Sequence, residues 1–140
     1  MSHKVVDTLN ELRSQPAGLH KVSDGPVFVD RRSKTLASSD DVTEEEVWAR
    51  YHEAVAEVRR AWGQPELGPT GYAYEGPGWR AGYKGECPSP DESLRHLYCQ
   101  ALRIGWWKRA GFVHAVMVTG HDANTLQLLQ LAVTQAREDA

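Results

Sequence analysis

Two histidines and an aspartate in the last third of the chain have the side chains needed for acid–base chemistry. His114 lies in an apolar run, and His121 directly precedes Asp122. A carboxylate beside an imidazole can form a proton-transfer pair. Each residue also has a simpler interpretation. Asp122 belongs to a Gly-His-Asp-Ala-Asn sequence typical of a turn, and His114 is in phase with the apolar residues Phe112 and Val116. We therefore predict a hydrogen-bonded structural role for His114.

A second group has the residue types of a zinc site. His96 and Cys99 are three residues apart, so a helix would place both on one face, and Cys87 lies nearby in the sequence. These three ligands and a fourth from elsewhere could hold zinc. However, the chain lacks the paired Cys-x-x-Cys units of such sites. We predict no metal site, no cofactor, and two reduced cysteines.

Sequence signatures of common enzymes are missing. No serine lies in a Gly-x-Ser-x-Gly setting. The glycine-rich stretch 63–85 lacks the Gly-Lys-Ser/Thr ending of a P-loop and does not join a clear strand to a clear helix. We predict no catalytic residue, and the chain is expected not to be an enzyme.

The strongest candidate for a binding surface is the sequence Trp106-Trp107-Lys108-Arg109. In a strand, the two tryptophans point to opposite faces of the sheet. If one packs in the core, the other lies beside two cations. An exposed aromatic ring with basic neighbours can stack on nucleic-acid bases or anchor a protein interface. Alternatively, a helix or loop covers the second ring. The cations Arg31, Arg32 and Lys34 could add to a phosphate-binding surface, although a bare charge cluster of this kind more often serves solubility.

These residues depend on a predicted antiparallel meander over residues 101–133. Three apolar runs are separated by turn signals at 108–111 and 120–124. Leu102, Ile104 and Trp106 alternate onto one face of the first run. The second run is apolar on both faces, so we expect it to be central and covered on both sides. In the third run the phase changes, which predicts a β-bulge near Leu128 and Leu129. A helix from Asn124 onward is the competing interpretation.

A helix over residues 43–62 is expected to pack on this sheet. Thr43 and Glu46 have the spacing of a capping box. Apolar residues then recur at steps of three and four, which predicts a buried stripe consisting of Val47, Tyr51, Ala54, Val55, Val58 and Trp62. Gly63 and Pro65 end the helix.

The remaining segments give shorter elements. We predict a helix at 4–14, a hairpin with strands at 19–22 and 27–30, and an exposed, mobile connection at 30–42, which is polar and rich in Ser and Asp. Short strands are predicted at 72–74 and 79–83, with an ordered loop as the alternative for much of this segment. A helix is predicted from Ser89 to about Leu97, with a longer first strand of the meander as the alternative.

Composition limits the class of protein. The chain has 140 residues and a formal net charge of -3, without the basic excess of a dedicated nucleic-acid binder. It contains no membrane-length apolar run and no secretory signal, so we expect a cytoplasmic protein. We predict one α+β domain over residues 1–140, in which a mainly antiparallel sheet packs against an amphipathic helix.

The predicted order of elements resembles, in architecture alone, small bacterial accessory proteins such as immunity proteins and secretion chaperones. We therefore expect a non-enzymatic protein-binding module of inhibitor, immunity or adaptor type, with another protein as partner. The first alternative is single-stranded nucleic-acid binding through Trp106 or Trp107 with Lys108 and Arg109. The second is a small enzyme or ligand-binding domain that uses His114, His121 and Asp122.

Overall fold

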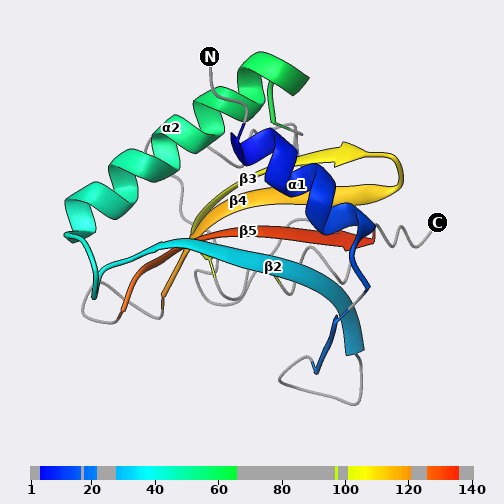
Figure 1. The fold of residues 1–140 in the computed structure, drawn as a ribbon, viewed down its shortest axis with the longest axis horizontal. Helices are drawn as coiled ribbons and strands as arrows, with labels where there is room; N and C mark the ends of the chain where they lie inside the picture. The colour runs from blue at the N-terminus through cyan, green and yellow to red at the C-terminus, as the bar shows by residue number, and fades with distance from the viewer. Residues whose placement is uncertain are drawn as a thin grey trace.

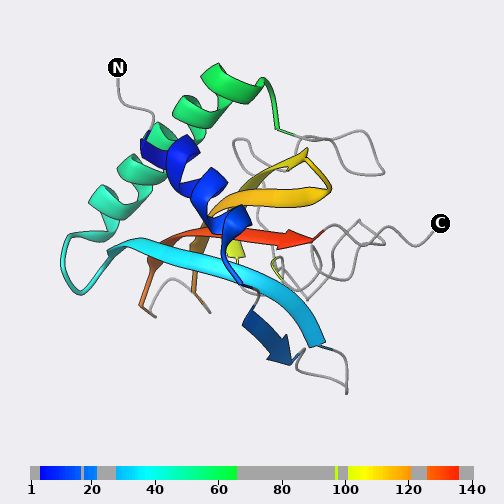
Figure 2. The same ribbon diagram turned by 45° about the vertical axis from the view of Figure 1, so that its right-hand side comes forward.

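The computed structural model describes residues 4–16, 18–21, 28–65, 97, 101–120 and 126–135. Within these residues two helices lie on one face of an antiparallel sheet (Figures 1 and 2). The helices are α1 (Lys4–Ser14) and α2 (Glu44–Trp62). The strands are β1 (Gly18–Lys21), β2 (Phe28–Ser38), β3 (Ala101–Arg109), β4 (Phe112–Thr119) and β5 (Leu128–Gln135), in the sheet order β1-β2-β5-β4-β3. The fold class is α+β.

The C-terminal meander is confirmed. β4 lies between β3 and β5 and pairs with both in antiparallel fashion. A two-residue turn of Ala110 and Gly111 joins β3 to β4, and both residues have positive φ, 53° and 79°. These angles match the type I′ turn that suits the twist of a hairpin. Residues 128–135 form a strand, so the strand interpretation was right and the competing helix is excluded.

The predicted bulge near Leu128 and Leu129 is wrong. The pairing of β4 with β5 runs without a break from Thr119–Leu128 to Phe112–Gln135. The irregularity lies instead on β2, between Thr35 and Ala37, opposite this part of β5. The apparent change of phase has a simple origin, because Leu126 and Gln127 precede the strand.

A second irregularity corrects the predicted faces of β3. The register shifts between Ala101 and Arg103. Leu102 therefore packs against the core on the helix side, whereas Ile104 and Trp106 belong to a second core cluster on the other face of the sheet. The sequence had placed all three on one face.

The prediction of an irregular connection at 30–42 is wrong over most of its length. β2 continues through these residues to Ser38 and pairs with β5, and only the turn at 39–42 joins it to α2. The predicted hairpin before it is confirmed by the antiparallel pairing of β1 with Phe28–Arg31, although its turn lies outside the described residues.

The helix over 43–62 forms as predicted. Thr43 is the N-cap, and its side chain accepts a hydrogen bond from the Glu46 amide at 3.1 Å. The Glu46 carboxylate accepts from Arg50 Nε at 3.0 Å, one turn along α2. Gly63 follows the last turn at φ 87°, and its amide donates to the Arg59 carbonyl.

Core residues occupy both faces of the sheet. On the helix side, the stripe of α2 packs with Leu9 and Leu12 of α1 and with apolar residues of β4 and β5. On the other side lies a second cluster of Leu97, Ala101, Ile104, Trp106, Val113, Ala115, Met117 and Ala132. β4 is buried on both faces, as its composition predicts.

Three further elements cannot be compared with the structure. The strands predicted at 72–74 and 79–83 lie outside the described residues, as does the helix from Ser89 apart from Leu97, which is helical and buried. Neither α1 nor α2 is long and apolar enough to cross a membrane.

Candidate functional site

The two tryptophans of β3 point to opposite faces, as alternation predicts, but both are buried. Trp106 is 5% exposed within the second cluster, and Trp107 is 2% exposed on the helix side. The Trp107 indole donates a hydrogen bond from Nε1 to the Gly63 carbonyl at 2.9 Å. Arg109 lies 4.7 Å from the ring centroid of Trp62 in α2. Neither indole of β3 therefore offers the open ring on which base stacking depends.

His114 is a core histidine held between the two helices. It is fully buried, and Arg13 Nη1 lies 3.1 Å from its Nε2. Its ring packs edge to face on Trp62, with 5.0 Å between the ring centroids. Because the guanidinium can only donate, Nε2 is the acceptor and Nδ1 carries the proton. The prediction of a hydrogen-bonded core histidine is confirmed.

The surroundings of His114 oppose a positive charge on its ring. Burial, followed by the Coulomb repulsion of Arg13, lowers the pKa of His114 to about 4; the backbone of Trp107 and Phe112 raises it in part, and Arg109 lowers it further. Within the described residues Nδ1 has no hydrogen-bond partner. The imidazole is therefore neutral at pH 7.

The structure does not test the other predicted candidates for acid–base or metal chemistry. His96, His121, Asp122, Cys87 and Cys99 are outside the described residues. In the part of the chain that is described, no three His, Cys, Asp or Glu side chains gather as metal ligands would.

The three cations near the start of β2 do not converge. Arg32 and Lys34 lie on the helix side of the sheet, where they are paired with Val133 and Leu131 of the neighbouring strand β5. Arg31 lies on the opposite side, 6% exposed, and donates to Gln130 Oε1 at 3.3 Å. Burial lowers the pKa of Arg31. A single phosphate-binding surface from these three residues is therefore not assembled.

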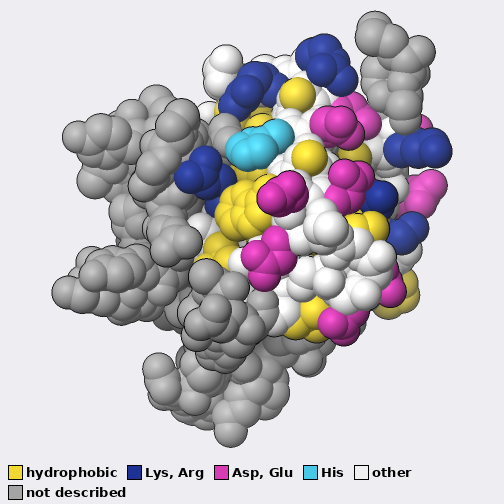
Figure 3. Space-filling model, turned by 90° about the vertical axis from the view of Figure 1, so that its left-hand side faces the viewer, with side chains coloured by type: hydrophobic (Ala, Val, Ile, Leu, Met, Phe, Trp, Pro, Cys, Tyr) yellow, Lys and Arg dark blue, Asp and Glu magenta, His cyan; other side chains and the backbone are white. Residues whose placement is uncertain are grey.

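A different surface combines charge with exposed apolar side chains. At the turn from β2 into α2, the exposed acidic residues are Asp40, Asp41, Glu44, Glu45 and Glu46. Figure 3 shows this end of the molecule, with acidic side chains beside apolar surface. We call these five residues, together with Trp48 and Leu126, the acidic face. Carboxylates in the first turn of α2 also suit the positive end of its dipole.

The apolar part of the acidic face is held in place by hydrogen bonds. Half-buried Trp48 donates from Nε1 to Gln127 Oε1 at 2.8 Å. The backbone amide of Gln127 donates to Ser39 Oγ at 3.0 Å, and the backbone amide of Ser39 donates to the backbone carbonyl of Gln127 at 2.9 Å. Leu126, the residue before Gln127, is 46% exposed, and among the described residues no other large apolar side chain is as exposed. The aromatic and aliphatic groups therefore lie on a fixed backbone among carboxylates.

The acidic face was overlooked at the level of sequence, although part of its signal is visible there. Five of the seven residues from Asp40 to Glu46 are acidic, and Trp48 comes two residues after Glu46. A solvated first turn is a sufficient explanation for the glutamates. The proximity of Leu126 cannot be read from the sequence, because 79 residues separate Trp48 from Gln127.

Comparison with known proteins adds no assignment to this geometry. No protein-family model, no curated protein and no solved structure matches the chain.

Proposed function

We propose that this chain is a small, non-enzymatic protein-binding module of inhibitor, immunity or adaptor type, whose acidic face holds a basic partner protein. The observation that carries the proposal is the set of five exposed carboxylates around Trp48 and Leu126. A tryptophan with an apolar neighbour can supply the desolvated centre of an interface. The surrounding carboxylates can select and orient a cationic partner.

The partner can be captured through this surface directly. A photo-reactive amino acid replaces exposed Ala49, the neighbour of Trp48, in the full chain within its own cells. The same group at exposed Ser14, at the end of α1, is the positional control. We expect a specific protein adduct at position 49 and not at position 14. The captured protein is then purified for titration calorimetry.

Charge reversal tests how that partner is held. Glu45→Lys should weaken binding by about tenfold at low salt, because a close opposite charge becomes a like charge. Added salt should reduce this difference by screening. Glu53→Lys makes the same change of charge at an exposed position about two turns further along α2 and is the matched control. An equal effect of both substitutions on the affinity would overturn the proposal. So would an affinity that changes neither with added salt nor with Trp48→Ala.

The two alternative functions have weaker support. Stacking on single-stranded nucleic acid requires an open ring beside Lys108 and Arg109, whereas Trp106 and Trp107 are buried. Acid–base chemistry at His114 requires access for a substrate, and that ring is 0% exposed.

A further inference from the structure

Among the described residues, no strand pairs with the outer edge of β2 beyond Arg31. β1 pairs with β2 only at Phe28–Arg31. Beyond that point Ser33, Lys34 and Thr35 are all exposed. Since neighbouring side chains in a strand point to opposite faces, three exposed residues in a row mean that neither face is covered here. The backbone groups on this edge are able to pair with another strand.

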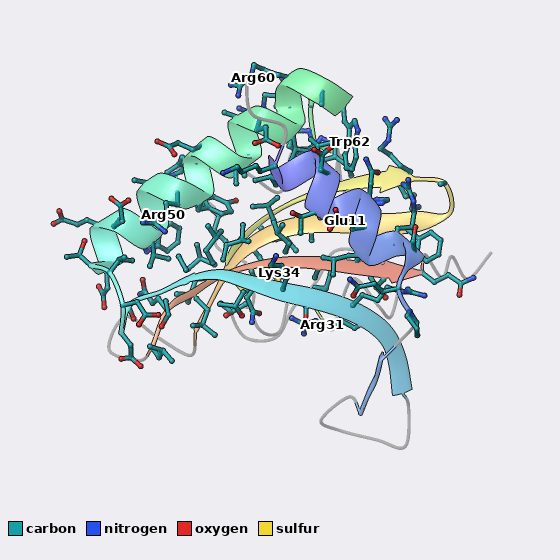
Figure 4. The ribbon with its side chains drawn as sticks, viewed as in Figure 1. Glu11, Arg31, Lys34, Arg50, Arg60 and Trp62 are labelled. Carbon is teal, nitrogen blue, oxygen red and sulfur yellow. The ribbon has the colours of Figure 1, made fainter. Side chains whose placement is uncertain are left out.

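A groove of about 460 Å³ runs along this edge beneath α1. Lys34 and Leu36 line it from β2, and Val5, Asp7 and Glu11 line it from α1. Figure 4 labels Lys34 and Glu11 on the two sides. In the described part of the chain, Lys34 forms no ion pair with either carboxylate, and both carboxylates are exposed. The groove therefore brings Lys34 and two carboxylates to an apolar floor without an ion pair between them, and Lys4 of α1 also lines it.

We propose that this edge and groove form the interface with a second copy of the chain, through antiparallel pairing of the two β2 strands. Such an interface is isologous, so each surface must complement itself. α1 and β2 run in opposite directions, because Arg32 bonds to Gln15 after the end of α1 while Leu36 lies by Val5 at its start. A two-fold axis near Lys34 sets the two grooves side by side, so each Lys34 side chain can reach the carboxylates of the other copy as well as those of its own.

Lys34 helps to decide which strand can bind. A lysine on an edge strand discourages pairing with other extended chains, because its charge must be desolvated or matched. A second copy supplies Asp7 and Glu11 at the same groove, whereas an unrelated strand need not. The edge thus excludes most partners and accepts its own copy, which is specificity through a repulsive element. The acidic face lies at the end of β2 and stays accessible in this dimer.

The test measures the mass of the full chain by sedimentation velocity over a range of protein concentrations. We expect a monomer–dimer equilibrium in the unmodified protein. Lys34→Glu and Glu11→Lys should each raise the dissociation constant of the dimer by about tenfold, since each puts like charges together. Both residues are exposed, so neither substitution removes a core contact.

Mixing the two variants gives the decisive measurement. A Lys34→Glu chain and a Glu11→Lys chain have opposite charges at both symmetry-related contacts, so their mixture should recover dimers. Glu45→Lys changes the charge equally on the acidic face and should leave dimerisation unaltered. A protein that stays monomeric at the highest concentration, or a dimer that neither variant weakens, would overturn the proposal, as would a failure of the mixture to recover. None of these results bears on partner binding at the acidic face, which Lys34→Glu leaves intact.

Discussion

The pKa of His114 links a single buried ring to the stability of the protein. Its pKa is about 4 in the folded state against an ordinary 6.5, because burial and Arg13 oppose its charge. Between these values the unfolded chain binds more protons than the folded one. The stability that neutral His114 contributes to the folded state is therefore intact above pH 6.5, and it decreases as the pH falls to about 4. The full loss is about 3 kcal/mol of unfolding free energy.

Urea unfolding at a series of pH values from 8 to 4 measures this effect. His114→Gln cannot titrate, while its side-chain oxygen can still accept a hydrogen bond from Arg13. We expect this variant to lose less stability than the unmodified protein between pH 6.5 and 4. His52→Gln makes the same substitution at an exposed position and is the matched control. An unchanged pH dependence in His114→Gln would show that another group is responsible.

Residue-level reasoning from the sequence was most reliable where one side chain determines its own surroundings. Thr43 caps α2 because its hydroxyl satisfies an amide three residues away, which is a local event. Trp106 and Trp107 face opposite ways because a strand alternates. Their common burial could not be predicted, because it depends on what covers each face. The acidic face escaped notice for the same reason, since Trp48 meets Gln127 only in the folded chain.

At the scale of elements, α1 depends on α2 through one carboxylate. The Val6 amide is among the first four of α1, which have no partner within the helix. It donates to Glu57 Oε2 at 2.9 Å, and Glu57 is 9% exposed. A side chain of α2 thus acts as the cap of α1 and fixes the start of one helix against the other.

Removing this cap should weaken the attachment of α1. Glu57→Ala leaves a buried amide without an acceptor, so we expect a loss of about 1 to 3 kcal/mol in urea unfolding. Hydrogen exchange at the Val6 amide should become faster. Glu57→Gln keeps an acceptor oxygen and should lose less. The matched control is Glu53→Ala, one turn earlier and exposed, with an expected change within about 0.5 kcal/mol. Unchanged protection of Val6 in Glu57→Ala would contradict this role.

The elements that the sequence predicted well are those with their own periodic pattern. α2 has a continuous apolar stripe, and β4 is apolar on both faces. β2 was missed because Ser33, Lys34 and Thr35 are exposed and polar, so no alternation marks the strand. It is a strand because it pairs with β5, and the Thr35–Gln130 pair spans 95 residues of sequence. Long-range pairing of this kind leaves no local signal.

At the scale of the whole molecule, the proposed surfaces occupy separate parts of the fold. The groove under α1 contains charges of both signs, so it can complement the same groove of an identical copy. The acidic face has five carboxylates at the turn into α2, of which Glu46 is paired with Arg50, and this excess of negative charge suits a cationic partner. The formal net charge of -3 conceals this division, because it averages the two surfaces with the rest of the chain.

The two core clusters, one on each face of the sheet, make the domain organisation testable. Leu131 is fully buried on the helix side, and Met117 is fully buried on the other side, one strand away. Because both clusters share the strands β4 and β5, neither can lose its packing without affecting the other. If residues 1–140 are one domain, as the sequence predicts, both clusters should unfold in one transition.

Leu131→Ala and Met117→Ala each leave a cavity in a close-packed cluster, so each should lower the free energy of unfolding by about 2 to 5 kcal/mol. Urea unfolding is followed in both variants by far-ultraviolet circular dichroism and by tryptophan fluorescence. The two signals should stay coincident while the midpoint moves, since cooperative unfolding involves the whole sheet. Leu126→Ala, at an exposed position, should move the midpoint little. If Met117→Ala separated the two signals while Leu131→Ala did not, the cluster beneath the sheet would belong to an independent folding unit, and the single-domain prediction would be wrong.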